Sequence, residues 1–384
     1  MNIEEKEECR KILFITGTRA DYGKIKSLIK SVEASEEFEA YVFVSGMHIL
    51  NTFGGTYREV LKDHYKNTYV AFGLANTKSM SYDLGDTICN LSGYVRSVEP
   101  DMIVIHGDRI DALAGAVVGA LNNIRVVHIE GGELSGTIDE SIRHAISKFA
   151  HIHMVCNEEA KQRLIQLGEE QKHIHVIGSP DIDIMMSDKL PTLEEALDKY
   201  EIPFRDYGIL MYHPVTTEYD GIGDKVQNLV DAAIASGKNY IAVYPNNDLG
   251  SEIIMNEYKR LDGNKHFKIF PSLRFEHFLT LLKNAEFMMG NSSAGVRETS
   301  VYGVPAIDIG NRQSGRYSLN LSPNIQHVYE KRDDILKAIS QIDKHRIRTS
   351  AFGDGNSTKR FMEILQEEEI WEFKLQKQFV DLEM

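Results

Sequence analysis

Short apolar runs alternate with amphipathic stretches along most of the chain, and no other feature of the sequence constrains the fold as strongly. The run "KILFITG" (residues 11–17) has the composition of a buried strand, and "DYGKIKSLIKSVEA" (21–34) then carries apolar residues at helical spacing. Strands that alternate with helices in this way form βαβ units around a parallel sheet. We therefore predict an α/β fold.

The apolar runs fall into two series, separated by a polar stretch at residues 186–206 that contains two prolines. The first series predicts strands at 11–17, 39–46, 101–107, 124–130, 151–156 and 173–178. The second series predicts strands at 207–214, 239–245, 266–271, 285–291 and 304–310. A chain of 384 residues exceeds the usual size of a single core. We predict two Rossmann-like, doubly wound domains, at residues 1–185 and 207–356. A linker at 186–206 joins them, and a helical tail at 357–384 follows the second domain.

Composition and charge exclude several classes of protein. The formal net charge of −14 disfavours nucleic acid as a partner, because phosphate backbones are held by basic surfaces. No apolar stretch approaches the roughly 20 residues of a membrane helix, and the acidic start lacks the apolar core of a secretory signal. The three cysteines form no C-x-x-C pair, which argues against a disulfide framework or a zinc site. We expect a cytoplasmic protein with no nucleic-acid or membrane partner, whose charge still permits a small phosphorylated ligand.

Polar residues directly follow most of the predicted strands, in "GTRAD", "SGMH", "HGDR", "HIEGGE", "GSPD", "YHP", "YPNND" and "GNSS". In doubly wound sheets, ligands bind beyond the carboxyl ends of the strands. Both series of strands contribute such segments. The sequence therefore predicts a ligand site in a cleft between the two domains.

The segment "GNSSAGVRE" (290–298) is typical of an anion site. Ser292 and Ser293 offer donors where a strand passes into a helix, whose N-terminus is positive. Glu298 in the next turn can accept from ribose hydroxyls, and "GNRQSGR" supplies Arg312 and Arg316 after the next strand. A capped turn explains the serines alone, whereas serines beside two arginines favour a diphosphate.

Further candidates for a nucleotide site lie at other strand ends. Arg19 opens the first helix and can complete an anion site. His213 ends a strand and can donate to a phosphate oxygen, and "YPNND" supplies amides and a carboxylate suited to ribose or phosphate. Ordinary turn and cap roles are the alternative for each of these residues.

Three carboxylates are candidates for acid–base chemistry. Asp108 and Glu130 each end a buried strand, and Asp139 opens the helix after "EGGELSGTI". Asp108 and Asp139 could each simply cap a helix, but an ordinary structural role of this kind does not account for Glu130 at the end of a buried strand. Carboxylates brought together can divide acid and base roles. The strand histidines lack the Cys partners or H-E-x-x-H spacing of a zinc site, so we expect no metal.

With these residues assembled, the chain closely resembles the hydrolysing UDP-N-acetylglucosamine 2-epimerases of sialic acid biosynthesis (the bacterial NeuC type) and the epimerase half of the bifunctional animal enzyme. The resemblance runs through "GTRADYGKI", "HGDRIDALA", "HIEGGELSGTIDESIRHAISK", "HPVTTE", "YPNND", "GNSSAGVRE" and "GVPAIDIGNRQSGR". It implies a GT-B-like architecture, with the nucleotide in the interdomain cleft and held mainly by the C-terminal domain. It also implies a tail that packs back onto the first domain, and a homo-oligomer, either a dimer or a tetramer.

The resemblance implies a site and a reaction as well. UDP contacts carried over by position fall on Arg19, Gly23, Arg109, His213, Asn246, Ser292, Ser293, Glu298 and Arg312. Gly23 stands where some relatives have Ser, so only a backbone contact is expected there. The catalytic candidates are Asp108, Glu130, Asp139 and His213. The implied reaction converts UDP-N-acetylglucosamine and water to N-acetylmannosamine and UDP, by elimination to a 2-acetamidoglucal and hydration, with no cofactor.

Other interpretations stay open on the sequence alone. The same motifs serve this reaction on UDP-N,N′-diacetylbacillosamine, which leads to legionaminic acid. A GT-B glycosyltransferase would share the nucleotide site but has no use for the C2 base that the loop from Glu130 to Asp139 predicts. A nucleotide-sugar sensor would not need three carboxylates. Which carboxylate abstracts a proton and which donates one is left unassigned.

Overall fold

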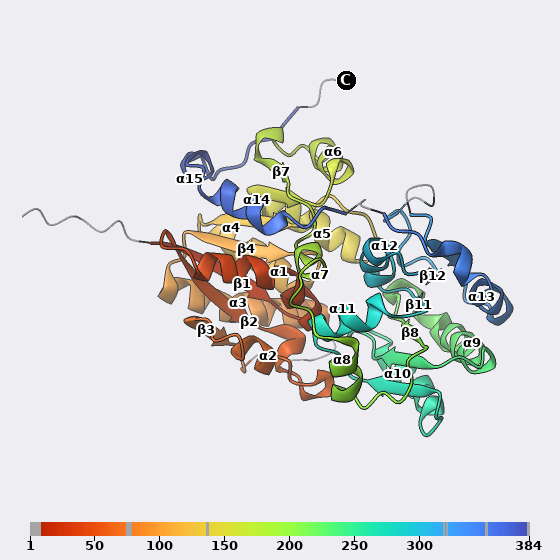
Figure 1. The fold of residues 1–384 in the computed structure, drawn as a ribbon. Coiled ribbons are helices and arrows are strands. Elements are labelled where there is room, and N and C mark those ends of the chain that lie inside the picture. Colours follow the sequence, from red (N-terminus) through yellow and green to blue (C-terminus); the bar gives the residue numbers. More distant parts are fainter. Residues whose placement is uncertain are drawn as a thin grey trace, which may run out of the picture.

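The computed structural model describes residues 9–73, 79–135, 138–317, 319, 322–349 and 352–381. Within these ranges, two parallel β-sheets with helices packed on their faces form two halves that lie side by side (Figure 1). The buried apolar residues of the strands and helices form separate clusters on the two faces of each sheet. The predicted α/β fold of two doubly wound sheets is confirmed.

In the described part of the chain, the first half holds a seven-stranded sheet of order β3-β2-β1-β4-β5-β6-β7. Its strands are β1 (Arg10–Thr16), β2 (Phe38–Val44), β3 (Asn67–Val70), β4 (Met102–His106), β5 (Arg125–Ile129), β6 (Ile152–Val155) and β7 (Ile174–Val176). Its helices are α1 (Arg19–Glu33), α2 (Tyr57–Leu61), α3 (Met80–Val98), α4 (Ile110–Leu121), α5 (Ile138–Phe149) and α6 (Glu158–Gln166). In parallel register, Ile12 of β1 lies opposite Ala40 of β2 and Met102 of β4.

The second half, over its described residues, holds a six-stranded sheet of order β10-β9-β8-β11-β12-β13. Its strands are β8 (Gly208–Met211), β9 (Tyr240–Val243), β10 (Phe267–Phe270), β11 (Phe287–Gly290), β12 (Ala306–Ile309) and β13 (Ile325–Val328). Its helices are α9 (Ile222–Ala235), α10 (Ser251–Tyr258), α11 (Phe275–Lys283), α12 (Glu298–Tyr302) and α13 (Arg332–Ile339). Helices α7 (Pro180–Met185) and α8 (Leu193–Lys199) lie between the halves in sequence, and α14 (Ser357–Leu365) and α15 (Glu369–Glu372) follow the second half.

The sequence did not reveal the edge strands β3 and β13. Each has four residues, and most of the positions in each are only partly buried or exposed. Edge strands pair on one side and are often short, so they lack the continuous apolar run that marks a central strand.

Residues 186–206, predicted as a linker, include helix α8. Thr192 caps this helix in a capping box with Glu195, while Ala196 and Leu197 supply its buried face. Helix α8 packs against α11, and the preceding α7 packs against α1 of the first half and against α11 and α12 of the second. The connection is therefore a packed part of the boundary between the halves, and its buried face is too short to produce a clear apolar period in the sequence.

The segment after residue 352 returns to the first half (Figure 1). Helix α14 packs on α1 and α7, and its Phe361 and Leu365 join the core cluster of the first sheet. Trp371 of α15 stacks on Phe38 of β2, with ring centroids 6.1 Å apart. The guanidinium of Arg10 lies 4.5 Å from the Trp371 ring. These contacts attach the tail to the first sheet beside β1 and β2.

Candidate active site

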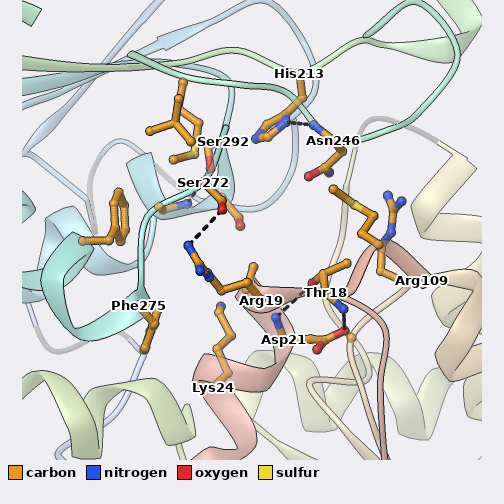
Figure 2. A pocket seen from close by; sticks show the side chains of 18 of the residues that line it. Thr18, Arg19, Asp21, Lys24, Arg109, His213, Asn246, Ser272, Phe275 and Ser292 are labelled. Carbon is orange, nitrogen blue, oxygen red and sulfur yellow. Dashed lines mark hydrogen bonds between the residues drawn. The ribbon is translucent and has the colours of Figure 1, made fainter. Parts of the chain in front are cut away.

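A large cleft lies at the carboxyl ends of the strands of both sheets, and Figure 2 shows side chains from both halves on its walls. It encloses about 1450 Å³, including its open mouth. Residues that follow β1, β4 and β5 form one wall, and residues that follow β8, β9, β11 and β12 form the other. Parallel strands bring these loops to one edge of each sheet, and the two edges face each other.

Most residues predicted from the sequence line this cleft, namely Arg19, Asp108, Arg109, Glu130, His213, Asn246, Ser292, Ser293, Glu298 and Arg312. Gly23 and Asp139 are not part of the lining. A Cβ at Gly23 would lie 2.4 Å from Cγ of Phe275, so the glycine lets the Phe275 ring, which does line the cleft, pack on α1. Asp139 is buried behind Arg312, with Oδ2 and Nη2 3.3 Å apart.

Neighbouring residues hold His213 in place after β8. Asn291 accepts a hydrogen bond from the backbone N–H of His213 at 2.6 Å and donates to its carbonyl at 2.8 Å. The backbone N–H of Asn246 donates to Nδ1 of the ring at 3.0 Å (Figure 2), so Nε2 carries the proton. Burial, followed by the charge of Arg312, lowers the pKa of His213 to about 3. The neutral ring therefore has an N–H donor for a ligand.

The turn after β11 presents small donors to the cleft. Ser292 begins a 3₁₀ turn over Ser293–Gly295, where its hydroxyl accepts from the N–H of Ala294. Helix α12 then begins at Glu298, so the segment after β11 forms a 3₁₀ turn followed by a short helix. Burial raises the pKa of Glu298, although the charge of Lys24 opposes this shift.

Arginines from different elements form the positive part of the cleft. Nη1 of Arg19 donates to Oγ of Ser272 at 2.9 Å (Figure 2). Arg109 makes a two-pronged ion pair with Asp248 of the second half, with N–O distances of 2.9 and 3.1 Å. Arg312 donates to the carbonyl of Asn291 at 3.2 Å. Planar guanidinium groups in this arrangement suit the oxygens of a diphosphate.

Asp108 follows β4 and is surrounded by arginines. Its carboxylate pairs with Arg143 of α5 and lies 3.3 Å from Nη2 of Arg316 in the second half. Burial alone would raise the pKa of Asp108, but Arg143, Arg316, Arg109 and Arg312 outweigh burial and lower it to about 2. Asp108 is therefore ionised at neutral pH.

Glu130 follows β5 with a φ of +66°, a backbone conformation that is uncommon for residues other than glycine. Its Oε1 lies 2.6 Å from Nη2 of Arg297 and 3.7 Å from Nζ of Lys24, and its Oε2 lies 3.2 Å from Nε2 of His106. Burial alone would raise the pKa of Glu130, but Arg297, Lys24 and His106 together hold it well below its usual range. The cleft thus contains a second ionised carboxylate, which is buried, whereas Asp108 is only partly buried.

Sequence reasoning missed most of the cations that pair with these two carboxylates, namely Lys24, His106, Arg143 and Arg297. Arg143 lies one helical turn after Asp139 on α5, and Arg297 lies inside "GNSSAGVRE". The sequence did contain a signal for such residues: a charged side chain at a position where the amphipathic pattern expects a buried, apolar one. Their acidic partners lie on other elements, which a local pattern does not reveal.

The described residues show neither a metal site nor a membrane-spanning helix. No group of three or more His, Cys, Asp or Glu side chains among them is arranged to hold a metal ion. No helix in the same ranges combines the length and apolar character that a membrane span requires.

The two parallel sheets and the cleft between their strand ends define a GT-B-like α/β protein. Within that class, the chain belongs to the UDP-N-acetylglucosamine 2-epimerase family, whose profile matches residues 30–366. It is 48% identical to the UDP-N-acetylglucosamine 2-epimerase of Neisseria meningitidis serogroup B, over 98% of this chain and 100% of that protein. It is 34% identical to the UDP-N,N′-diacetylbacillosamine 2-epimerase (hydrolyzing) of Legionella pneumophila, over 93% of this chain and 96% of that protein.

Solved structures of the same family share the fold. The crystal structure of a UDP-GlcNAc 2-epimerase from Neisseria meningitidis bound to UDP-GlcNAc matches with a TM-score of 0.77 and 18% sequence identity. The match covers 92% of this chain and 99% of that one. At this identity the likeness establishes the arrangement of the two halves and nothing finer.

Proposed function

We propose that this protein is a hydrolysing UDP-N-acetylglucosamine 2-epimerase that produces N-acetylmannosamine and UDP for sialic acid biosynthesis. The observation that carries the proposal is that two ionised carboxylates of the first half, the partly buried Asp108 and the buried Glu130, share one cleft with arginines and serines of the second half. The relative at 48% identity is named a UDP-N-acetylglucosamine 2-epimerase, and the relative at 34% carries "hydrolyzing" in its name. These names support the substrate and the hydrolysis, respectively.

The proposed reaction has two steps. A base removes the proton at C2 while the anomeric C–O bond to UDP breaks, which gives a 2-acetamidoglucal. Water then adds at C1, and a proton returns to C2 on the opposite face, which yields N-acetylmannosamine. We propose that Asp108 and Glu130, which line the cleft, move these protons. Asp139 is the third candidate of this set, although it lies against Arg312 and does not line the cleft. Asp108 and Glu130 are ionised and so can accept a proton.

The departing UDP needs its charge held as the C–O bond breaks. Preorganised donors and cations near a leaving diphosphate stabilise the transition state. The proposed diphosphate contacts are Arg19, Arg109, Arg312, the Nε2–H of His213, Ser292 and Ser293, with Glu298 and Asn246 toward the ribose. Gly23 contributes by letting Phe275 approach the cleft.

UDP-N,N′-diacetylbacillosamine is a second candidate substrate, because the Legionella pneumophila relative is named for it. Its 34% identity is lower than the 48% of the relative named for UDP-N-acetylglucosamine. We therefore favour UDP-N-acetylglucosamine and treat the diacetylated sugar as the alternative.

Proton NMR of the purified protein with UDP-N-acetylglucosamine in deuterated water, without added metal or NAD, tests the proposal. We expect free UDP and N-acetylmannosamine that carries deuterium at C2. N-acetylglucosamine that keeps its C2 proton would instead mean simple hydrolysis and would contradict the carboxylate roles. Turnover of the diacetylbacillosamine nucleotide alone would keep the mechanism and change the substrate.

A further inference from the structure

Arg297 is a buried arginine that bridges the two halves. It directly precedes α12 in the second half, lines the cleft and is 3% exposed. Its Nη1 lies 3.0 and 3.1 Å from the two carboxylate oxygens of Glu133, and its Nη2 lies 2.6 Å from Oε1 of Glu130. Both acids belong to the loop after β5 in the first half. One planar guanidinium thus binds two carboxylates of a single loop.

Further contacts fix the direction of this guanidinium. Nη2 also donates to Oγ of Ser179, which itself lies 2.8 Å from Oε1 of Glu130. The guanidinium lies 5.4 Å from the centre of the Phe352 ring. Burying a charge is costly unless it is paired and hydrogen-bonded, and here most of the pairing is with carboxylates. Packing alone does not require an arginine to be directed at an acid that lines the cleft.

Three cationic or ionisable groups contact Glu130: Lys24 of α1, His106 of β4 and Arg297 before α12. Arg143 of α5 and Cys156 after β6 interact with it electrostatically. Asp181 of α7 and Glu298 of α12 share Lys24 with it, and Glu133 of its own loop shares Arg297. Lys24 lies 3.5 Å from Asp181, 3.7 Å from Glu130 and 3.9 Å from Glu298, so three acids share its one charge. Arg297 makes a closer contact to Glu130 than Lys24 or His106 does. It is therefore the main counter-charge of this carboxylate.

We infer that Arg297 is a positioning residue, which orients the Glu130 carboxylate and supplies its counter-charge from the opposite half of the molecule. The inference rests on the proposed function and deepens it. Arg297 acts through Glu130 and needs no contact with the reacting atoms. Because the acid and its counter-charge come from different halves, Glu130 is prepared for proton transfer only where the two halves meet.

Two substitutions test this role. Arg297→Met removes the charge and keeps the length of the side chain, whereas Arg297→Lys keeps the charge and loses the two-pronged geometry. We expect kcat for UDP release from UDP-N-acetylglucosamine to fall about 100-fold with Met, within the range that a positioned acid or base contributes, and less with Lys. KM and the Kd for UDP change less than about threefold, because nucleotide contacts are left in place.

The pH profile provides a readout that a merely structural arginine would not move. Without Arg297, the Glu130 carboxyl holds its proton to higher pH, so the acidic limb of the kcat profile moves to higher pH in Arg297→Met.

A double variant provides a second readout. Adding Glu130→Gln to Arg297→Met should lower kcat little further, because both changes disable the same group. Arg348→Met is the matched control, since Arg348 donates to the carbonyl of Val301 on α12 at 2.9 Å and does not line the cleft. The control should keep wild-type kinetics and pH profile.

The outcomes separate this inference from the proposed function. If the wild-type protein does not turn over UDP-N-acetylglucosamine or its diacetylated analogue, the proposed function fails and the inference fails with it. If the wild-type protein is active and Arg297→Met keeps its kcat and its acidic limb, only the inference fails. Additive losses in the double variant would likewise assign Arg297 a structural role. Thermal melting shows whether Arg297→Met folds. If it does not, kcat and the acidic limb are compared between the wild-type protein and Arg297→Lys instead.

Discussion

Individual side chains give the cleft two regions of opposite charge. One acid is surrounded by cations, because Asp108 lies among Arg109, Arg143, Arg312 and Arg316. The reverse holds at Lys24, whose charge is shared by Glu130, Asp181 and Glu298. An excess of cations attracts a diphosphate, and a group of acids can exchange protons. In the proposed reaction, the cations hold the departing diphosphate, and carboxylates of both regions, Asp108 and Glu130, move protons.

Asp108→Asn should abolish turnover while leaving UDP binding largely intact. The amide keeps the shape of the side chain but cannot accept a proton as the carboxylate does, so we expect kcat to fall about 100-fold or more. Initial rates of UDP release and calorimetry with UDP measure the two effects. Asp354→Asn is the control, because Asp354 pairs with Arg360 outside the cleft. Full activity in Asp108→Asn would remove this residue from the acid–base set.

Arg312→Ala should act mainly on nucleotide affinity. A charged hydrogen bond to a phosphate is worth about 1.5–3 kcal/mol, so the Kd for UDP should rise about 10- to 100-fold. Calorimetry with UDP gives this value directly. Arg332→Ala, which removes an exposed arginine paired with Asp333, should leave the Kd unchanged. Unchanged affinity in Arg312→Ala would exclude this arginine from the diphosphate site.

At the scale of elements, the pairing of β11 with β8 positions the wall of the cleft that the second half provides. Gly290 lies opposite Met211 in the parallel register and has a φ of +134°. A Cβ at this position would lie 1.9 Å from the carbonyl oxygen of Met211, so the two strands approach more closely than any other residue permits. The next residue, Asn291, holds the backbone of His213. The close approach thus aligns the turn after β11 with the end of β8.

Gly290→Ala should therefore destabilise the second half. Both the clash with a backbone oxygen and the unfavourable φ oppose the new side chain, and we expect a loss of more than about 3 kcal/mol in the free energy of unfolding. Urea unfolding measures the loss. Gly295→Ala provides the control, because the nearest atom to its Cβ, Sδ of Met288, is 4.0 Å away. Equal stability of the two variants would contradict the close approach of β8 and β11.

At the scale of the whole molecule, buried neutral histidines link stability to pH. Burial lowers the pKa values of His48, His128 and His213 to about 3 in each case. In the unfolded chain these rings titrate near a pKa of about 6.5. Between the two values the unfolded state binds protons that the folded state does not, so acid favours unfolding. The stability that these rings contribute is present above pH 6.5 and is lost as the pH falls toward 3.

The variant His128→Gln isolates one of these contributions. His128 is fully buried, with Nε2 2.8 Å from the carbonyl of Gly107 and Nδ1 3.2 Å from Oγ of Ser147. The free energy of unfolding, measured in urea at pH 7.5 and pH 5.5, should decrease with acid in both proteins. The decrease should be smaller in His128→Gln, because one titrating ring is gone. An equal or larger decrease in the variant would mean that His128 titrates normally in the folded state.

The sequence by itself determined the order of the elements and the face on which the site forms. Central strands such as β1 and β4 are buried on both faces, so they appear in the sequence as continuous apolar runs. The polar segments that follow them, including Asp108 and Glu130, mark the carboxyl edges where ligands bind. Short edge strands and the capped helix α8 were missed because one-sided burial over a few residues leaves no clear period.

Only the tertiary structure decided which charges meet. Arg297 and Glu133 are 164 residues apart in the chain, and their pairing depends on how the two halves pack. Likewise, the sequence predicts only a backbone contact of Gly23 with UDP, and the packing of α1 against α11, which places Phe275 on Gly23, emerges from the tertiary structure. Local patterns record whether a side chain is buried or caps a helix. Ion pairs between distant segments depend on the crossings of strands and helices, so their partners emerge only once the two sheets face each other.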